Sequence, residues 1–499
     1  MGTTVIHERE ENGRISEIHV GNGTVKTIGI GLSEKGAGHI GRLYVIDLLT
    51  RVFLPSGYPN TVSPDLPIKG RLSSVRTISE DITILCKPTS SYQILNALQA
   101  FCNSLASLLS SRAILQGFGV GDPTATPTRA MLLTVLQDVF GRLTTILSAY
   151  IIGSSLYPEA KTYRLLADLL NDTAVILDTL SPLLNTFPIP GLRVSALCLS
   201  ASFKALCGIC AGGSKAAITM HFATPLEGRG DVGDLNAKDG SKETVLALLG
   251  MLLGTLIVPY LSTSWTTYTS LFILVGLHLG INYFGVRGLV LRSLNRQRLG
   301  IAWLLYQQSS TSKVPTPSRV ADMEGIFGHP AVIRDVQANQ VIGHCTIGSS
   351  FSQVLRQPCP PEVLDLFNRQ RYIIWFDHRC VREQLGSTKR QTLHGLTRLH
   401  IFLKEGYTGD DQLRAWVHAV EVCRSRASAS RESTRGELEA REILQMADET
   451  VTKQLTKFVT EMQAAGWNTD ECAIMTGSPD AVVTRITVED RHVEEKKNQ

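Results

Sequence analysis

Residues 233–261 read GDLNAKDGSKETVLALLGMLLGTLIVPYL, and they place a polar, charged stretch directly before a long apolar one. Residues 245–261 carry no charged side chain, and a run of this length matches a membrane span. A second apolar run, SLFILVGLHLGINYFGV, follows at residues 270–286. The residues between the two runs are too few and too polar for a third element, so we predict a helical hairpin.

The polar stretch at residues 233–244 is interpreted as a loop that orders the start of the first hairpin helix. Asp239, Ser241 and Thr244 are plausible caps, and Glu243 suits a first helical turn. We expect this loop to lie at the aqueous end of the hairpin. Contact with a ligand or ion is the alternative role for its charged side chains.

Several residues in and after the hairpin bear on whether it spans a membrane or lies in the core of a soluble domain. Gly250 and Gly254 form a small-xxx-small pair that permits close helix approach. The arginines beyond the hairpin favour a cytosolic or matrix-like side for that end; they are Arg287, Arg292, Arg296 and Arg298. A buried hairpin of a large soluble helical domain is the alternative, and Tyr260, His278 and Asn282 favour it because polar groups in spans are uncommon.

Composition divides the chain into two unlike halves. Charged residues make up 19% of the 499 residues, a little below the roughly 25% of soluble domains. Residues 91–295 are apolar and rich in small side chains, whereas residues 296–499 carry dense mixed charge. We expect a membrane-like half joined to a soluble half. The net charge of +4 and the absence of a basic run with aromatics give no reason to expect nucleic acid as a partner.

Ten scattered cysteines indicate a reducing compartment rather than a disulfide framework. Cys207 and Cys210 form a CxxC on a small-residue helix face, where packing is the expected role, and neither a metal nor another cofactor is expected. The first residues, MGTTVIHEREEN, resemble no targeting peptide, and Ile6 argues against myristoylation of Gly2.

The pattern along the chain predicts a mainly α fold, with a helical membrane-associated domain followed by a small α+β C-terminal domain. Residues 1–45 form an N-terminal arm with a short hairpin turning at Asn22-Gly23. Residues 46–300 form the helical domain, residues 301–330 a linker, and residues 331–499 the C-terminal domain. RYIIWFDH and TRLHIFLKEG are predicted strands there, and DDQLRAWVHAVEVCRS is a predicted helix.

Charged side chains interrupt the apolar helices of residues 91–295. Asp138 and Arg142 stand at i, i+4 and are expected to face each other as an ion pair. Asp168, Lys204 and Lys215 lie in the helices that follow. Because charges in apolar helices are costly and usually functional, we expect these five residues to line a path for a small molecule or ion.

The apolar half also contains a possible internal repeat. Each copy has a helix ending near Ser-Arg/Lys-Ala, a Gly-rich loop with Val-Gly-Asp, and two further helices. Arg112 of the first copy corresponds to Lys215 of the second, and Asp122 corresponds to Asp234. Such duplication predicts a roughly two-fold architecture, which is common in transporters.

The chain has no spacing typical of an enzyme. It contains no dinucleotide fingerprint, phosphate loop or GxSxG motif. Lys238 is a possible Schiff-base lysine, but the neighbouring Asp234 and Asp239 stabilise its ammonium form. We therefore expect no catalytic activity. A pyridoxal-phosphate sensor that uses Lys238 or Lys215 is a weaker alternative.

Several long motifs resemble the root UVB sensitive family. They are FLPSGYPNTVSPD, YQILNALQAFCNSLASLLSSRAILQGFGVGD, ADLLNDTA, KAAITMHFA, GDLNAKDGSKETV and VRGLVLRSLNRQR, in this order across Val52–Arg298. LHIFLKEGYTGDDQLRAWVHA resembles the C-terminal domain of that family, and the whole is similar to fungal members. Residues 66–91 depart from the family pattern and look like an insertion.

The resemblance implies an integral or tightly bound protein of an intracellular membrane. Plant members are linked to plastids, ultraviolet-B responses, auxin transport and vitamin B6 homeostasis, with no established reaction or catalytic residue. The family motifs cover these candidate positions: Arg112, Gly119, Asp122, Lys215, His221, Lys238, Asp239, Gly240 and Glu243.

Two functions are compatible with the resemblance. The first is a path for small molecules or ions, with the lipid membrane as partner. The second is a membrane-anchored scaffold that recruits a protein partner, or forms a homo-oligomer, through its C-terminal domain.

Overall fold

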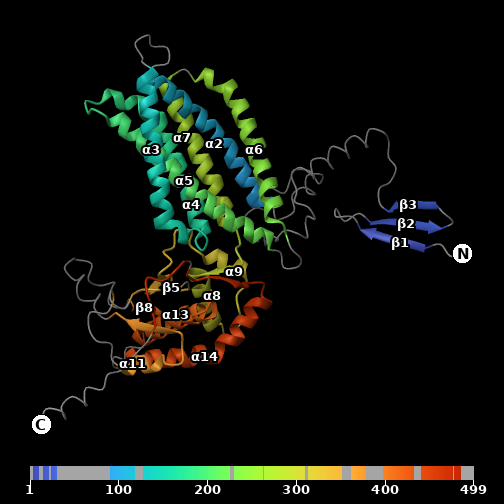
Figure 1. Cartoon of the computed structure of the whole chain (residues 1–499), viewed down its shortest axis with the longest axis vertical. Helices are drawn as coiled ribbons and strands as arrows, with labels where there is room; N and C mark the ends of the chain where they lie inside the picture. The colour runs from blue at the N-terminus through green and yellow to red at the C-terminus, as the bar shows by residue number, and fades with distance from the viewer. Residues whose placement is uncertain are drawn as a thin grey trace. The chain divides into compact units, whose positions relative to one another are not determined.

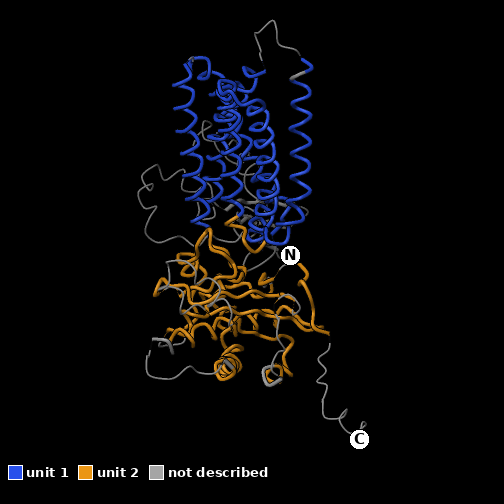
Figure 2. The backbone as a smooth tube through the Cα atoms, turned by 90° about the vertical axis from the view of Figure 1, so that its left-hand side faces the viewer, with its two compact units in different colours: residues 1–156, 163–289 blue, residues 157–162, 290–499 orange. Residues whose placement is uncertain are grey.

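The computed structural model places the chain in two compact units (Figures 1 and 2). Unit 1 comprises residues 1–156 and 163–289, and unit 2 comprises residues 157–162 and 290–499. The structure describes residues 4–9, 15–21, 24–30, 90–118, 127–224, 230–261, 263–309, 313–335, 337–350, 354, 361–377, 397–431, 440–475 and 477–484. The insertion-like residues 66–91 therefore lie almost wholly outside the described residues.

The N-terminal arm forms a three-stranded antiparallel sheet. Strand β1 is Thr4–Arg9, β2 is Ile15–Gly21 and β3 is Thr24–Ile30, in the order β1-β2-β3. Gly21 pairs with Thr24, which confirms the predicted hairpin, and β1 adds a strand that the sequence pattern did not predict.

The described part of unit 1 holds six long α-helices that run up and down beside one another (Figure 1). Four of them are long and apolar enough to cross a membrane: α3, α5, α6 and α7. Short 3-10 turns follow α3, α4 and α6. The helices are α2 (Ser90–Gly117), α3 (Pro127–Ile152), α4 (Ala160–Leu180), α5 (Leu192–Ala223), α6 (Val232–Ile257) and α7 (Ser264–Gly288).

The polar stretch at residues 233–244 is helical, so its prediction as a loop is wrong. Helix α6 begins at Val232, and the Asp231 carboxylate caps it by accepting hydrogen bonds from the Gly233 and Asp234 amides at 2.7 and 3.2 Å. The hydroxyls of Ser241 and Thr244 donate to carbonyls four residues back. The hydrogen-bonding capacity of these hydroxyls is therefore used inside the helix, and neither residue caps the helix start.

Helices α6 and α7 follow one another as predicted, but α2 lies between them (Figure 1). A side chain at Gly250 would meet the Phe101 carbonyl oxygen at 2.7 Å, and Gly254 faces Leu108. The glycine pair therefore permits close approach to α2 rather than to α7. The Arg112 guanidinium of α2 donates to the Val258 and Leu261 carbonyls at 3.0 and 2.9 Å and so holds the end of α6.

Unit 2 is an α+β domain. Strand β8 is central in its main sheet, pairing parallel with β6 and β10 and antiparallel with β7, while β5 pairs antiparallel with β6. Strands β4 and β9 pair separately. The elements are β4 (Ser293–Asn295), α8 (Arg296–Gln308), α9 (Pro317–Met323), β5 (Val332–Asp335), β6 (Gln340–Ile347), α11 (Pro361–Leu366), β7 (Tyr372–Phe376), β8 (Thr397–Lys404), α13 (Gly409–Arg431), α14 (Ala440–Ala464), β9 (Asn468–Ala473) and β10 (Val482–Val483). The predicted strands and helices of this domain are confirmed.

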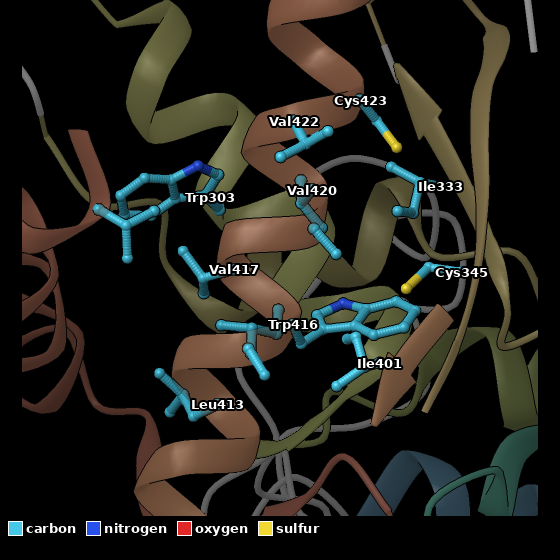
Figure 3. Close-up of a cluster of buried hydrophobic side chains, with 14 of the residues drawn as sticks. Trp303, Ile333, Cys345, Ile401, Leu413, Trp416, Val417, Val420, Val422 and Cys423 are labelled. Atoms are coloured by element: carbon cyan, nitrogen blue, oxygen red, sulfur yellow. The ribbon is translucent and has the colours of Figure 1, made fainter. Parts of the chain in front are cut away.

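The core of unit 2 forms where α13 packs on the sheet (Figure 3). Trp416 and Val420 of α13 are buried together with Ile401 of β8, and Trp303 of α8 is fully buried as well. Residues 301–330 are therefore not a linker. They contain most of α8 and all of α9, because the apolar face of α8 is needed to complete this core.

A buried ion triad joins the 157–162 segment to the rest of unit 2. The Lys161 ammonium lies 2.6 Å from one Glu324 oxygen, and the Arg298 guanidinium lies 2.8 Å from the other. The two cations hold the pKa of Glu324 below its usual range despite complete burial, so the carboxylate stays charged. The triad explains why the first residues of α4 and those just before it belong to unit 2.

Candidate functional site

One face of α4 carries buried polar side chains along its length. Arg164, Asp168, Asp172 and Asp178 are all buried in unit 1, and the half-buried Asn171 lies among them. A buried ion or amide is costly unless it is paired, so the partners of these groups define what the interior can do.

Helix α2 supplies one set of partners at heptad spacing. The Arg164 guanidinium donates to the Asn96 side-chain oxygen at 2.7 Å, and the Asn171 amide donates to Asn103 at 2.8 Å. The Ser110 hydroxyl donates to Asp178 at 3.3 Å. Each of these pairs is separated by 68 positions, so α2 and α4 run parallel in a constant register.

Helix α7 supplies the partners for the middle of α4. His278 Nδ1 lies 2.8 Å from the Asp172 carboxylate, and the Asn282 amide donates to Asp168. Asp168 also lies 3.8 Å from Arg164. His278 and Asn282, whose polarity supported the soluble alternative, are therefore members of this interior network.

The network continues into a charged cluster at the start of α6, defined here as Lys215, Asp239, Glu243, Asn96 and Arg164. The Lys215 ammonium donates to both Glu243 oxygens at 2.9 and 3.0 Å, and it lies 3.9 Å from Asp239. The Asn96 amide donates to Glu243 and accepts from Arg164. The charged cluster thus joins α2, α4, α5 and α6.

A small cavity of about 10 Å³ is lined in part by four residues of the charged cluster: Asn96, Arg164, Lys215 and Asp239. That is room for a single water molecule. The lining includes Asp239, whose Oδ1 accepts no hydrogen bond from the described residues. A partly unsatisfied carboxylate beside a cavity is the arrangement expected where a polar guest is exchanged.

Other predicted site residues lie outside the charged cluster. Lys204 pairs with Asp178, while Arg112 holds the end of α6. Asp138 and Arg142 are exposed on α3 and make no ion pair with each other among the described residues, so the expected pair is wrong. Helix α3 packs on α5 near Gly141 and Gln137, and neither Asp138 nor Arg142 is covered by that contact.

The remaining predicted site residues lie at the end of α5, in the first turns of α6 or outside the described residues. His221 is buried near the end of α5 with its ring 5.3 Å from that of Phe222. Asp234 and Lys238 are partly exposed in the first turns of α6. Asp122 lies outside the described residues.

Sequence reasoning missed Asn96, Arg164 and Asp178. Their signal was present as two heptad series of polar residues in otherwise apolar helices, at 96, 103 and 110 and at 164, 171 and 178. Among the described residues, no group of three or more His, Cys, Asp or Glu side chains is placed to hold a metal ion.

Residues 42–310 match the family model described as the vitamin B6 photo-protection and homoeostasis domain. The chain belongs to the root UVB sensitive family. The matched residues include all of the charged cluster, so this cluster lies inside the part that defines the family.

Curated relatives extend the similarity. RUS family member 1 of Dictyostelium discoideum is 31% identical over 286 residues, which are 56% of this chain and 48% of that protein, so the match spans about half of the relative. Protein root UVB sensitive 3 of Arabidopsis thaliana is 27% identical over 84% of this chain and 82% of its own. Protein root UVB sensitive 2, chloroplastic, of the same plant is 22% identical over 87% of this chain and 85% of its own length. No solved structure matches the chain.

Proposed function

We propose that this root UVB sensitive protein spans an intracellular membrane and moves a small polar solute through its helical unit, as part of vitamin B6 homoeostasis. The observation that carries the proposal is a series of charged and polar side-chain pairs inside helices whose outer faces are apolar. No reaction is proposed, because the network holds paired charges rather than a nucleophile with its base.

The exterior of unit 1 supports the membrane part of the proposal. Large apolar side chains along α3, α6 and α7 are exposed, far more than a soluble monomer leaves uncovered. Tyr150 is 89% exposed at the end of α3, and Tyr260 and Trp265 are 85% and 79% exposed near the α6–α7 turn. These aromatics lie at opposite ends of the apolar helices, as in the interfacial belts of membrane proteins.

The interior supports the solute path. Lys215, Arg164 and Asp239 present both charge signs around a cavity with room for one water, and Glu243 pairs with Lys215 beside it. A zwitterionic or hydroxylated heterocycle could replace the contacts that these groups make with one another. The description of the family domain names vitamin B6, so pyridoxine is the first solute to test.

Two measurements on the full-length protein test the proposal. The protein should stay in the membrane pellet after alkaline carbonate extraction, whereas release into the supernatant would contradict a spanning fold. In liposomes it should take up radiolabelled pyridoxine. Because a hydrogen bond to a charged group contributes roughly 1.5–3 kcal/mol, Glu243→Gln should lower the initial rate about tenfold or more.

Asp138→Asn is the matched control for Glu243→Gln. It also neutralises one carboxylate in unit 1, but Asp138 is exposed on α3 and lies outside the charged cluster. Its uptake should equal that of the wild type. Equal uptake by wild type and Glu243→Gln, with both folded, would contradict a role for the charged cluster.

A scaffold that recruits a protein partner is the second candidate function. Unit 2 favours it, because an open cavity of about 380 Å³ there is lined by Lys313, Arg319 and Thr316 among others. Affinity capture with full-length protein should then recover a partner that Lys313→Glu with Arg319→Glu no longer retains. Identical recovery by wild type and variant would count against this surface.

A further inference from the structure

The six helices of unit 1 fall into two sets of three. Helices α2, α3 and α4 begin 102, 105 and 104 positions before α5, α6 and α7, respectively. The sequence similarity between the two parts of the apolar half therefore corresponds to equivalent helices. A nearly constant spacing is what an internal duplication leaves in a structure.

The two sets make equivalent contacts with each other. The first helix of each set packs along the second helix of the other, as α2 on α6 and α5 on α3. Both pairs run parallel. Gly250 and Gly254 face Phe101 and Leu108, whereas a Cβ added at Gly141 would lie 3.7 Å from the Ala201 carbonyl oxygen, and the Gln137 amide donates to the Leu197 carbonyl.

The direction of the helices makes this repeat inverted. Helices α2 and α3 run in opposite directions (Figure 1), and α5 runs parallel to α3. Equivalent helices α2 and α5 are therefore antiparallel, and so are α4 and α7, as their paired side chains show. A two-fold axis across the helices relates the two sets, which is the arrangement of many transporters.

Asp172 and His278 lie on this pseudo-two-fold axis. They are separated by 106 positions, nearly the spacing of the repeat, and His278 Nδ1 is 2.8 Å from the Asp172 carboxylate. Equivalent residues that contact each other must lie on the axis that relates them. Both lie near the middle of their helices and their side chains are only 2% and 3% exposed.

The groups that face this pair come from all the helices around it. They are Asp168 and Asn171 from α4, Cys102 and Asn103 from α2, and Cys207 from α5. Arg164 lies 3.8 Å from Asp168, and the ion-pair partner of Asp172 is His278.

We propose that Asp172 and His278 form a proton-binding site on the axis of two inverted repeats, and that this proton is coupled to solute movement. The second clause rests on the proposed function. The imidazole nitrogen takes a proton from water on one side and releases it to water on the other. Binding changes the net charge of the pair from −1 to zero, and no other covalent bond changes.

A difference titration of the purified full-length protein in detergent tests the site without any solute. His278→Gln should bind about one proton fewer than wild type between roughly pH 8 and pH 5. Asp172→Asn should give a titration curve that differs from wild type, because the carboxylate that lies 2.8 Å from His278 Nδ1 is gone. Titration curves of wild type and His278→Gln that superimpose would overturn the site.

His329→Gln calibrates the titration. His329 is exposed and belongs to unit 2, so His329→Gln removes one histidine and leaves the Asp172–His278 pair intact. Helical circular dichroism equal to wild type establishes that each variant is folded. An Asp172→Asn curve identical to wild type would show that the pair is not one site.

Uptake of pyridoxine into liposomes tests the coupling. An inward proton gradient should drive accumulation by wild type, whereas His278→Gln should exchange pyridoxine across the membrane but no longer accumulate it. Equal accumulation by both proteins would overturn the coupling. Absence of any pyridoxine movement by wild type would contradict the proposed function instead, and the titration alone then decides the site.

Discussion

Glu243 joins side chains of three helices in one small volume. It accepts hydrogen bonds from Asn96 of α2 and Lys215 of α5 while it belongs to α6 itself. Replacing Glu243 removes the acceptor of both bonds at once and leaves Asp239, 3.9 Å away, as the carboxylate beside Lys215. A neutralising substitution at Glu243 therefore tests both contacts at once.

Glu159 is the residue of unit 2 whose protonation should control stability near neutral pH. Burial is the largest influence on it and raises its pKa from the ordinary 4.5 to about 7, with Glu324 adding to the rise and Arg298 opposing it. A carboxyl whose folded pKa is raised stabilises the fold below its unfolded pKa, and this stability is lost as pH rises through about 7.

Glu159→Gln should therefore remove part of the pH dependence. The wild type should lose stability between about pH 4.5 and 7. At about 1.36 kcal/mol per pKa unit, the loss is at most about 3 kcal/mol. The true loss should be smaller, because Glu159 is partly exposed and solvent screens its charge. The variant should show a flatter midpoint-against-pH curve and unfold at higher temperature above pH 7. Thermal unfolding across this range is the measurement, and parallel curves would contradict the assignment.

At the scale of elements, α2 is the helix around which the others assemble. It packs along both α6 and α7, and it pairs with α4 through the 68-position register. Its contact with α6 is close because Gly250 has no side chain where the Phe101 carbonyl approaches. Backbone cannot move aside as the end of a flexible side chain can, so this contact tolerates no added atom.

Gly250→Ala should destabilise the helical unit even though alanine is the better helix former. Overpacking of this kind costs about 1–3 kcal/mol. Gly276→Ala is the matched control, because an added Cβ at Gly276 meets no atom within 4 Å and should be neutral or stabilising by up to about 1 kcal/mol. Thermal unfolding in detergent compares the two, and equal midpoints would contradict the close α2–α6 contact.

The apolar runs predicted the helices well, while their partners were not predictable. Most of residues 245–261 lie in α6, which ends at Ile257, and residues 270–286 lie within α7, yet the two helices are separated by α2. Hairpin helices are neighbours in most folds, and the sequence carries no signal that a helix far earlier in the chain lies between them. The predicted start of α6 was also wrong. Asp231 caps the helix, whereas the sequence offered the later polar residues Asp239, Ser241 and Thr244 as caps.

For the whole molecule, Trp265 offers a direct test of the membrane proposal. It is the one tryptophan of unit 1, since the other four of the five lie at 303, 375, 416 and 467. In liposomes, lipids brominated near the headgroup should quench tryptophan fluorescence more than lipids brominated near the chain end. Trp265→Phe should remove most of this difference, and quenching unchanged by the substitution would contradict an interfacial Trp265.

The sequence by itself determined the helices, the α+β C-terminal fold and the family. Apolar runs and turn residues act locally, and the family motifs are long enough to be specific. It also indicated the repeat, through a few matched positions. The candidate site was predicted in part, since Lys215, Asp239 and Glu243 were named from motifs while Asn96 and Arg164 were not.

Only the tertiary structure decided which of these charges meet. Periodicity tells which face of a helix is polar, but it does not tell which neighbour that face contacts. The constant register of α2 on α4 and the antiparallel approach of α7 bring Asp168 to Asn282 and Asp172 to His278. Those contacts depend on glycine positions and side-chain fit between helices far apart in the chain, which is why the interior network follows from packing rather than from pattern.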